Sequence, residues 1–156
     1  MTRDEILKIL ESCLPVAEPP YDLPPAHAWS ELTHRLGMQF PREFVEFMEL
    51  LTCFEFPGDI YNISKLGRTN GNDTIADVYD FEVSHNEFWP SWLVPFYGIG
   101  NGDYFGFDMR TSTESEVLYW YHEVQMAKRD AASFAQWVER LPAFLSGDPT
   151  ENSPGK

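Results

Sequence analysis

The sequence predicts an α+β domain with a mostly antiparallel sheet and helices packed on one side of it. Apolar residues recur at helical spacing in the first third of the chain and again near its end, which indicates amphipathic helices. The middle contains short apolar runs separated by glycine-containing turns, a pattern typical of strands. Separate runs of helices and strands favour an α+β fold over alternating βαβ units. With 156 residues, the chain has the size of a single domain.

The chain is expected to divide into four parts. Residues 1–14 carry a Thr-x-x-Glu capping box followed by apolar residues at helical spacing, which predicts a helix over about residues 3–13. Residues 15–25 contain five prolines, a density that no helix tolerates, so we expect an extended connector. Residues 26–145 would form the main domain. Residues 146–156 lack an apolar anchor and are expected to be a disordered tail.

The helices of the main domain are expected near its two ends. One would begin with Pro25 in its first position and end at Gly37, because glycine readily adopts the left-handed conformation of a helix C-cap. The next would open at Pro41. A last helix would be capped by Ser133, and Pro142 would limit its length.

Strands are expected between these helices. In the region 52–92, the apolar patches Thr74–Val78 and Tyr79–Val83 lie between turn signals and are interpreted as short strands. The clearest signal is Gly100–Asp103, where Asn-Gly between apolar runs predicts a β-hairpin. Together with Val117–His122, the two strands of this hairpin would form the centre of the sheet.

The charge of the chain limits its partners. A net charge of −14, from 25 acidic and 11 basic residues, repels nucleic acids and anionic membranes, so neither is expected as a partner. It would attract a basic partner, although the same acids could serve solubility alone. The sequence shows no signal-peptide pattern, no apolar run of membrane-spanning length and no disulfide framework, so we expect a cytoplasmic location.

No motif predicts a cofactor, a metal ion or a catalytic centre. The run Gly98–Gly102 lacks the Gly-x-Gly-x-x-Gly spacing, and no helix follows it to bind a phosphate. His27 and His34 stand farther apart than paired metal ligands on a helix. Asp103 and Asp108 would point to opposite faces of a strand, and Asp103 is interpreted as a local cap of the turn. We therefore expect no enzyme activity, with a carboxylate-dependent hydrolase as the least favoured alternative.

One group of residues predicts a surface that binds a basic protein. Acidic side chains alternate with aromatic ones along residues 54–87, a combination that suits the anchors and rim of a protein interface. For any single residue, an ordinary solvated position is the simpler explanation. The predicted partner-binding residues are Asp59, Asp73, Asp77, Tyr79, Asp80, Phe81, Glu82 and Glu87.

Three blocks of the sequence follow one another in a recognisable order. In the first block, Ala28–Phe44, a helix that ends in Leu-Gly precedes a second helix that starts with Phe-Pro-x-x-Phe. The second block, Leu93–Trp120, contains the glycine turn and its strands. The third block, Ser133–Val138, begins with Ser-Phe. Together these blocks resemble the SUKH superfamily, which contains the fungal Smi/Knr cell-wall regulators and many bacterial toxin-immunity proteins. Phe40 replaces the family's common Leu, and Leu51–Phe54 stands where the family often has Asn-Gly.

The resemblance implies a SUKH-like single α+β domain without established enzymatic activity. Bacterial members of the family are often encoded beside secreted toxins and neutralise them by direct binding, and many such toxins are nucleases with basic surfaces. The resemblance therefore favours an immunity-type protein that binds a basic toxin, for example a nuclease. A regulatory protein-interaction scaffold of the Smi/Knr type is the alternative. No contact residue transfers by motif, because the binding sites of the family vary.

Overall fold

The computed structural model describes residues 1–67, 73–111 and 116–147. In these residues a five-stranded antiparallel sheet has the strand order β1-β2-β3-β4-β5, so that each strand pairs with its neighbours in the sequence. The strands are β1 (Asp59–Ile60), β2 (Leu93–Gly98), β3 (Tyr104–Asp108), β4 (Val117–Tyr121) and β5 (Met126–Ala131). The helices are α1 (Arg3–Cys13), α2 (Ala28–Leu36), α3 (Arg42–Leu50), α4 (Ile75–His85), α5 (Phe134–Glu139) and α6 (Leu141–Ser146), with a 3-10 turn at Leu51–Cys53.

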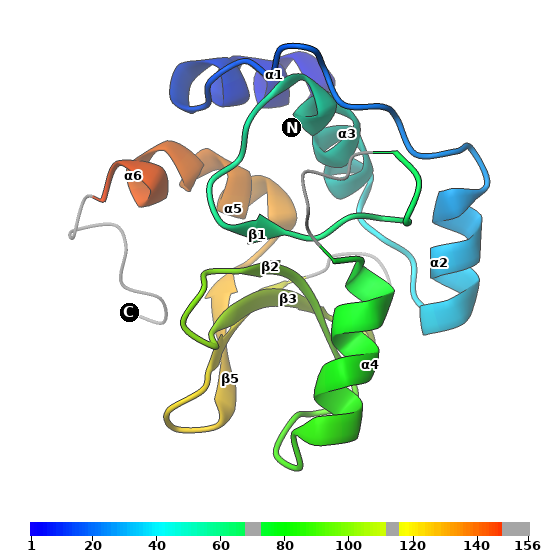
Figure 1. Ribbon diagram of the computed structural model, residues 1–156. Helices are drawn as coiled ribbons and strands as arrows, with labels where there is room; N and C mark the ends of the chain where they lie inside the picture. The colour runs from blue at the N-terminus through cyan, green and yellow to red at the C-terminus, as the bar shows by residue number, and fades with distance from the viewer. Residues whose placement is uncertain (68–72, 112–115, 148–156) are drawn as a thin grey trace.

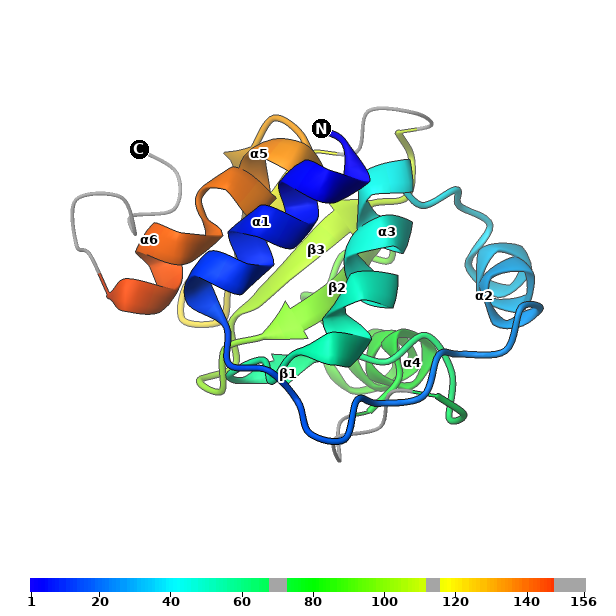
Figure 2. The ribbon, with the colours of Figure 1, turned by 90° about the horizontal axis from the view of Figure 1, so that it is seen from above.

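Four of the described helices form a layer over one face of the sheet. Helices α1, α3, α5 and α6 contact one another and lie together above the strands (Figure 1). Seen from above, α1 and α3 lie over β2 and β3, whereas α4 lies lower and to the side (Figure 2). Helix α4 packs against β2 and α2 instead. This arrangement confirms the predicted α+β class with its antiparallel sheet.

The main core lies between the helical layer and the sheet. Phe44 of α3 is fully buried, and its ring contacts Phe96, Phe107 and Phe134 at centroid distances of 5.0–5.5 Å. Aromatic pairs at this spacing stabilise a core beyond the area that they bury. The sheet buries its other face as well, because alternate side chains of a strand point to opposite faces. There Trp120 of β4 packs against Trp89 in a smaller apolar cluster.

Most of the predicted helix ends are confirmed. The Thr2 hydroxyl accepts a hydrogen bond from the Glu5 amide, and the Glu5 carboxylate accepts one from the Thr2 amide, which completes the capping box of α1. Helix α2 ends at Gly37, which has a φ of 67°. Its predicted start was wrong: α2 begins at Ala28, because Pro25 instead belongs to a turn in which its carbonyl accepts from the Ala28 amide.

The interpretation of Thr74–Val78 and Tyr79–Val83 as strands was wrong, since both patches belong to α4. The Thr74 hydroxyl caps this helix by accepting from the Asp77 amide at 3.2 Å. Only a narrow stripe of α4 is buried, and its last member is Glu82. Other large apolar side chains of the helix face solvent, including Phe81 at 58% exposure, so the helical period was hard to recognise.

The central hairpin is confirmed, and one strand was not anticipated. Strands β2 and β3 pair in antiparallel register on either side of a turn in which Gly100 and Gly102 have φ of 92° and 95°. Strand β5 had no sequence signal, because it lies at the edge of the sheet and only Ala131 of its six residues is buried.

The two segments outside the main domain were expected to be a connector and a tail. The connector is hydrogen-bonded to the 3-10 turn through the amides of Ala17 and Tyr21, which donate to the carbonyls of Cys53 and Thr52. Helix α6 continues to Ser146, and residues 148–156 of the predicted tail lie outside the described residues. None of the described helices is long and apolar enough to cross a lipid bilayer.

Candidate functional site

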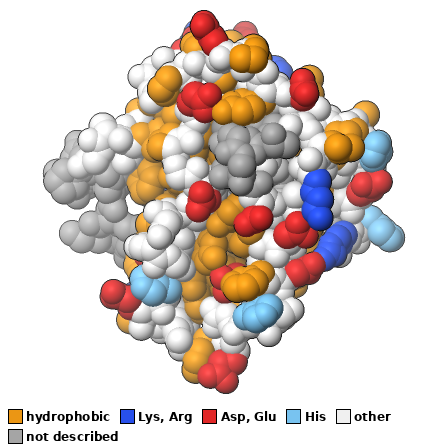
Figure 3. Space-filling model, viewed as in Figure 1, with side chains coloured by type: hydrophobic (Ala, Val, Ile, Leu, Met, Phe, Trp, Pro, Cys, Tyr) orange, Lys and Arg blue, Asp and Glu red, His pale blue; other side chains and the backbone are white. Residues whose placement is uncertain are grey.

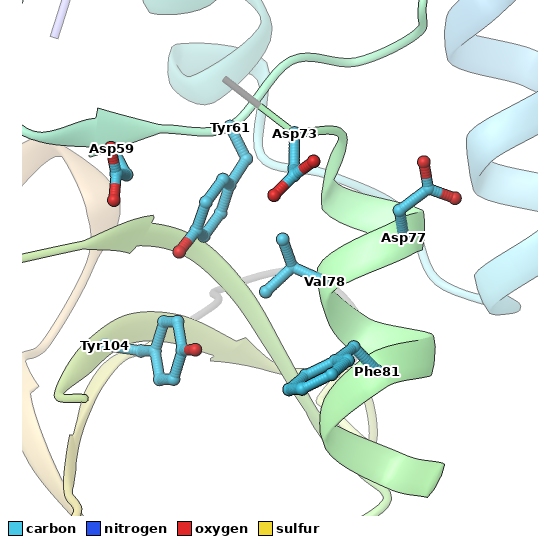
Figure 4. A pocket seen from close by; sticks show the side chains of 7 residues that line it. All are labelled: Asp59, Tyr61, Asp73, Asp77, Val78, Phe81 and Tyr104. Carbon is cyan, nitrogen blue, oxygen red and sulfur yellow. The ribbon is translucent and has the colours of Figure 1, made fainter. Parts of the chain in front are cut away.

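A cleft of about 550 Å³ opens between β1, the hairpin of β2 and β3, and α4. On this face of the molecule, acidic side chains surround exposed apolar ones (Figure 3). We call the cleft the acidic cleft, and Figure 4 shows the side chains that line it. They are Asp59, Tyr61, Asp73, Asp77, Val78, Phe81 and Tyr104.

Backbone pairing brings the acids of the cleft together from distant parts of the chain. Asp59 lies on β1, where it is paired with Gly98 of β2. Just beyond β1, the Asn62 amide donates to the Asp73 carbonyl, and the Asn62 carbonyl accepts from the Ile75 amide. These two bonds fix the start of α4 beside the end of β1. Asp73 therefore lies next to the strand that carries Asp59, although the two are 14 positions apart in the sequence.

Two tyrosines form the floor of the cleft. The rings of Tyr61 and Tyr104 lie 6.3 Å apart, and the Tyr104 hydroxyl donates to the Glu82 carboxylate at 2.7 Å. Burial raises the pKa of both tyrosines, and for Tyr104 the bond to Glu82 adds to the effect. Both hydroxyls therefore stay protonated near neutral pH. Gly98 makes room for this floor, because a Cβ at that position would clash with the Tyr61 hydroxyl oxygen.

The negative charge of the cleft is only partly compensated. Within the described residues, Asp59 and Asp73 form no ion pair. Asp77 lies 4.0 Å from Lys65, whose side chain is 81% exposed, so this pair contributes little. In Figure 4 the Asp77 carboxylate also points away from Tyr61 and Tyr104. Among the described residues, two carboxylates beside the tyrosine floor, those of Asp59 and Asp73, therefore have no compensating charge.

Phe81 forms an exposed aromatic wall at the other end of the cleft. Its ring stacks on the His85 ring at a centroid distance of 4.5 Å and an angle of 19°. The ring nitrogen Nδ1 of His85 lies 3.0 Å from the Phe81 carbonyl oxygen, which holds the histidine along the helix. A large apolar side chain that is held in place while 58% exposed is available to a partner.

The structure brings four of the predicted partner-binding residues together in the cleft. These are Asp59, Asp73, Asp77 and Phe81. Tyr61 and Tyr104 were not among the predicted partner-binding residues. Tyr61 had a signal, because it stands two positions after Asp59 in an extended segment, where alternate side chains share a face. Tyr104 had none, since only the fold brings β3 beside α4.

The other four predicted residues lie outside the lining. The Tyr79 hydroxyl donates to the Ser91 carbonyl at 2.6 Å, which ties α4 to the segment before β2. Asp80 forms an ion pair with Arg35 of α2. Glu82 is 8% exposed and supports the tyrosine floor from below. Glu87 is exposed in the turn that follows α4.

Asp103 does not act as a local cap, so that expectation was wrong. Its carboxylate accepts hydrogen bonds from the Tyr119 hydroxyl at 2.7 Å, the His122 amide at 2.8 Å and the His122 ring at 2.6 Å. The local bond of the turn comes from Asn101, whose side chain accepts from the Asp103 amide. Burial alone would raise the pKa of Asp103, but these bonds together lower it.

Asp108 has its own partner at the other end of β3. The Arg110 guanidinium donates to both of its carboxylate oxygens, at 2.8 and 3.0 Å, and this pairing lowers the pKa of Asp108. Asp103 and Asp108 are thus held separately and do not share a site, as hydrolysis by a carboxylate pair would require. In the part of the chain that the structure describes, no three His, Cys, Asp or Glu side chains are arranged to hold a metal ion.

Comparison with known proteins agrees with the fold. Neither the curated proteins nor the solved structures contain a match to this chain. A family model described as the SMI1 / KNR4 family (SUKH-1) matches residues 25–140, which is most of the sequence and includes every strand, the acidic cleft and the buried Asp103 network. The chain therefore belongs to the SMI1/KNR4 (SUKH-1) family.

Proposed function

We propose that this protein is an immunity protein that binds a basic protein toxin through the acidic cleft and thereby neutralises it. Family membership supports the general role, because SUKH proteins generally act in immunity or regulation rather than as enzymes. The observation that carries the proposal is the acidic cleft itself. It combines the exposed ring of Phe81 with the carboxylates of Asp59 and Asp73, which form no ion pair with another described residue.

The charge of the chain suits a basic partner. A net charge of −14 attracts a positively charged protein over distances of about 10 Å at ordinary ionic strength and increases the rate of encounter. A nuclease toxin needs a basic surface to hold its nucleic acid. An acidic protein bound to that surface would exclude the substrate, so neutralisation would need no chemical step. We expect the two proteins to meet in the cytoplasm of the cell that makes both.

The affinity would come mainly from the aromatic side chains. Exposed charge pairs typically contribute less than about 1 kcal/mol each, because water and salt screen them. A buried aromatic anchor at an interface contributes roughly 2 kcal/mol or more. Phe81 can lose most of its exposed surface to a partner, and the carboxylates around it would select a partner of positive charge.

Co-expression with the toxin encoded beside this gene tests the proposal. A bacterial host that expresses the toxin domain should survive when it also expresses this protein. The variant Asp59→Asn/Asp73→Asn/Phe81→Ala should protect less, because it removes the acids and the anchor from exposed positions. The proposal would be overturned if cells that express the toxin and the wild-type protein survived no better than cells that express the toxin with an empty vector.

Binding in solution tests the electrostatic part. The dissociation constant of the purified complex should rise as salt increases from about 0.05 to about 0.5 M, since exposed charges are screened over this range. A constant that does not change with salt would remove electrostatic attraction from the explanation.

A further inference from the structure

We infer that the acidic cleft receives the side chain of an arginine from the protein partner. This inference rests on the proposed function and adds the chemistry that the partner must supply. A volume of about 550 Å³ lies within the range of pockets that enclose small ligands, about 300–1,000 Å³. The cleft is therefore large enough for a protruding side chain together with part of its backbone.

The arrangement of the acids fits a planar cation. In Figure 4, Asp59 and Asp73 lie on either side of the Tyr61 ring, on separate segments of the chain. A guanidinium has five N–H donors in one plane and can reach carboxylates on two sides at once. An ammonium group presents its three donors around a single point and loses more hydration on leaving water. Two separated carboxylates therefore favour arginine over lysine.

The aromatic lining favours the same side chain. Tyr61, Tyr104 and Phe81 bound the space below the two acids (Figure 4). A guanidinium stacks on aromatic faces while its edge keeps its hydrogen bonds, so it can use both kinds of lining together. The stacking of Phe81 on His85 holds this wall in position before a ligand arrives, which reduces the entropy lost on binding.

The described part of the chain does not supply this cation itself. Lys65 lies 4.0 Å from Asp77, but its side chain is 81% exposed and does not line the cleft. Arg35 is paired with Asp80 on the side of α4 that faces α2. No cation of the residues that the structure describes therefore pairs with the two carboxylates beside Tyr61, and a partner can supply one.

A peptide titration of the purified protein tests the inference without any toxin. The probes are acetyl-Gly-Arg-Gly-amide and acetyl-Gly-Lys-Gly-amide, added at low salt while amide and tyrosine signals are followed by NMR. Signals of residues that line the cleft should shift, and the arginine peptide should bind at least about threefold more tightly than the lysine peptide, because a planar, weakly hydrated guanidinium gains more from aromatic faces than an ammonium does. Equal affinities, or shifts spread over the whole surface, would overturn the inference.

A matched pair of variants separates the cleft from net charge. Asp59→Asn/Asp73→Asn should weaken arginine binding roughly fivefold or more, since each exposed ion pair contributes up to about fivefold in affinity. The control Glu11→Gln/Glu139→Gln removes the same charge from exposed positions on α1 and α5 and should change affinity less than about twofold. Equal losses in the two variants would show that only the overall charge matters.

The Phe81→Ala variant tests the stacking directly. It should reduce the preference for arginine over lysine while leaving the carboxylates in place, and an unchanged preference would count against the aromatic contact.

The inference and the proposed function can fail separately. If the wild-type protein protects cells and Asp59→Asn/Asp73→Asn protects equally, the arginine inference is refuted and the function remains. If the peptide binds in the cleft but the wild-type protein gives no protection, the immunity function is refuted.

Discussion

Replacement of Asp103 by alanine should destabilise the whole sheet, although the residue stands in a surface hairpin. Asp103 is 8% exposed, and its carboxylate connects the turn between β2 and β3 to the end of β4. It accepts from the Tyr119 hydroxyl and from both the amide and the ring of His122. The substitution removes the acceptor that ties the turn before β3 to the end of β4.

The size of the effect follows from the donors that remain. Tyr119 is 5% exposed, so its hydroxyl would be left without a partner, which costs about 1–3 kcal/mol. The His122 side chain is 42% exposed, so water can replace part of its loss. We expect Asp103→Ala to lower the free energy of unfolding by about 3 kcal/mol and Asp103→Asn by about 1–2 kcal/mol, because the amide keeps one acceptor but loses the charge.

Urea denaturation of a double-mutant cycle measures this contribution. The variants are Asp103→Ala, Tyr119→Phe and the combination of the two, with Glu11→Gln on α1 as an exposed control. The coupling between Asp103 and Tyr119 should be about 1 kcal/mol or more, because the phenylalanine leaves no hydroxyl to be orphaned. A loss in Asp103→Ala within about 0.5 kcal/mol of the control, or a coupling near zero, would refute the reasoning.

The same network predicts a dependence of stability on pH. Hydrogen bonds from His122 and Tyr119 outweigh the effect of burial and lower the pKa of Asp103 in the folded state. A lowered pKa stabilises the fold above the unfolded value of about 3.9, and this stabilisation is lost as the pH falls through the folded value. The stability difference between wild type and Asp103→Asn should therefore shrink below about pH 4. A difference that stays constant down to about pH 2 would contradict the assignment.

Three further substitutions test the packing and the helix that forms the cleft, each by denaturation against wild type. Phe44→Ala should cost about 3–5 kcal/mol, because it empties the centre of the aromatic core. Thr74→Ala should cost about 1 kcal/mol and increase amide exchange at the start of α4, since the Asp77 amide loses its cap. Gly106→Ala should cost roughly 1–3 kcal/mol, because its Cβ would lie 2.6 Å from the Val94 carbonyl oxygen on the neighbouring strand. A loss below about 0.5 kcal/mol in any of these variants would contradict the structural role inferred for the substituted residue.

The elements that were predicted correctly depend on local signals. The capping box of Thr2 and Glu5 lies within one helical turn, and the C-cap at Gly37 needs only the conformation of one residue. The hairpin at Gly100–Asp103 likewise follows from its turn residues. Strand β5 could not be predicted in this way, because it forms by pairing with β4 and its exposed side chains carry no apolar alternation.

The role of Asp103 shows the same limit at a single residue. An aspartate in a glycine turn usually bonds to the backbone beside it, which was the local expectation. In the structure its partners are Tyr119 and His122, on and just after a strand that begins 14 positions later. No local sequence pattern marks a residue that accepts hydrogen bonds from a distant part of the chain, so the partners of Asp103 could be identified only from the fold.

The misassigned helix and the acidic cleft have the same physical origin. Helix α4 was hard to recognise because Phe81 is exposed where an amphipathic helix would have a polar residue. An exposed aromatic side chain lowers stability and solubility unless a partner covers it. Apolar residues at positions that are normally polar tend to lie at functional sites. Phe81 also lines the acidic cleft, about one turn of α4 after Asp77. The feature that obscured the helix in the sequence is therefore a specific reason to look for the partner on this helix.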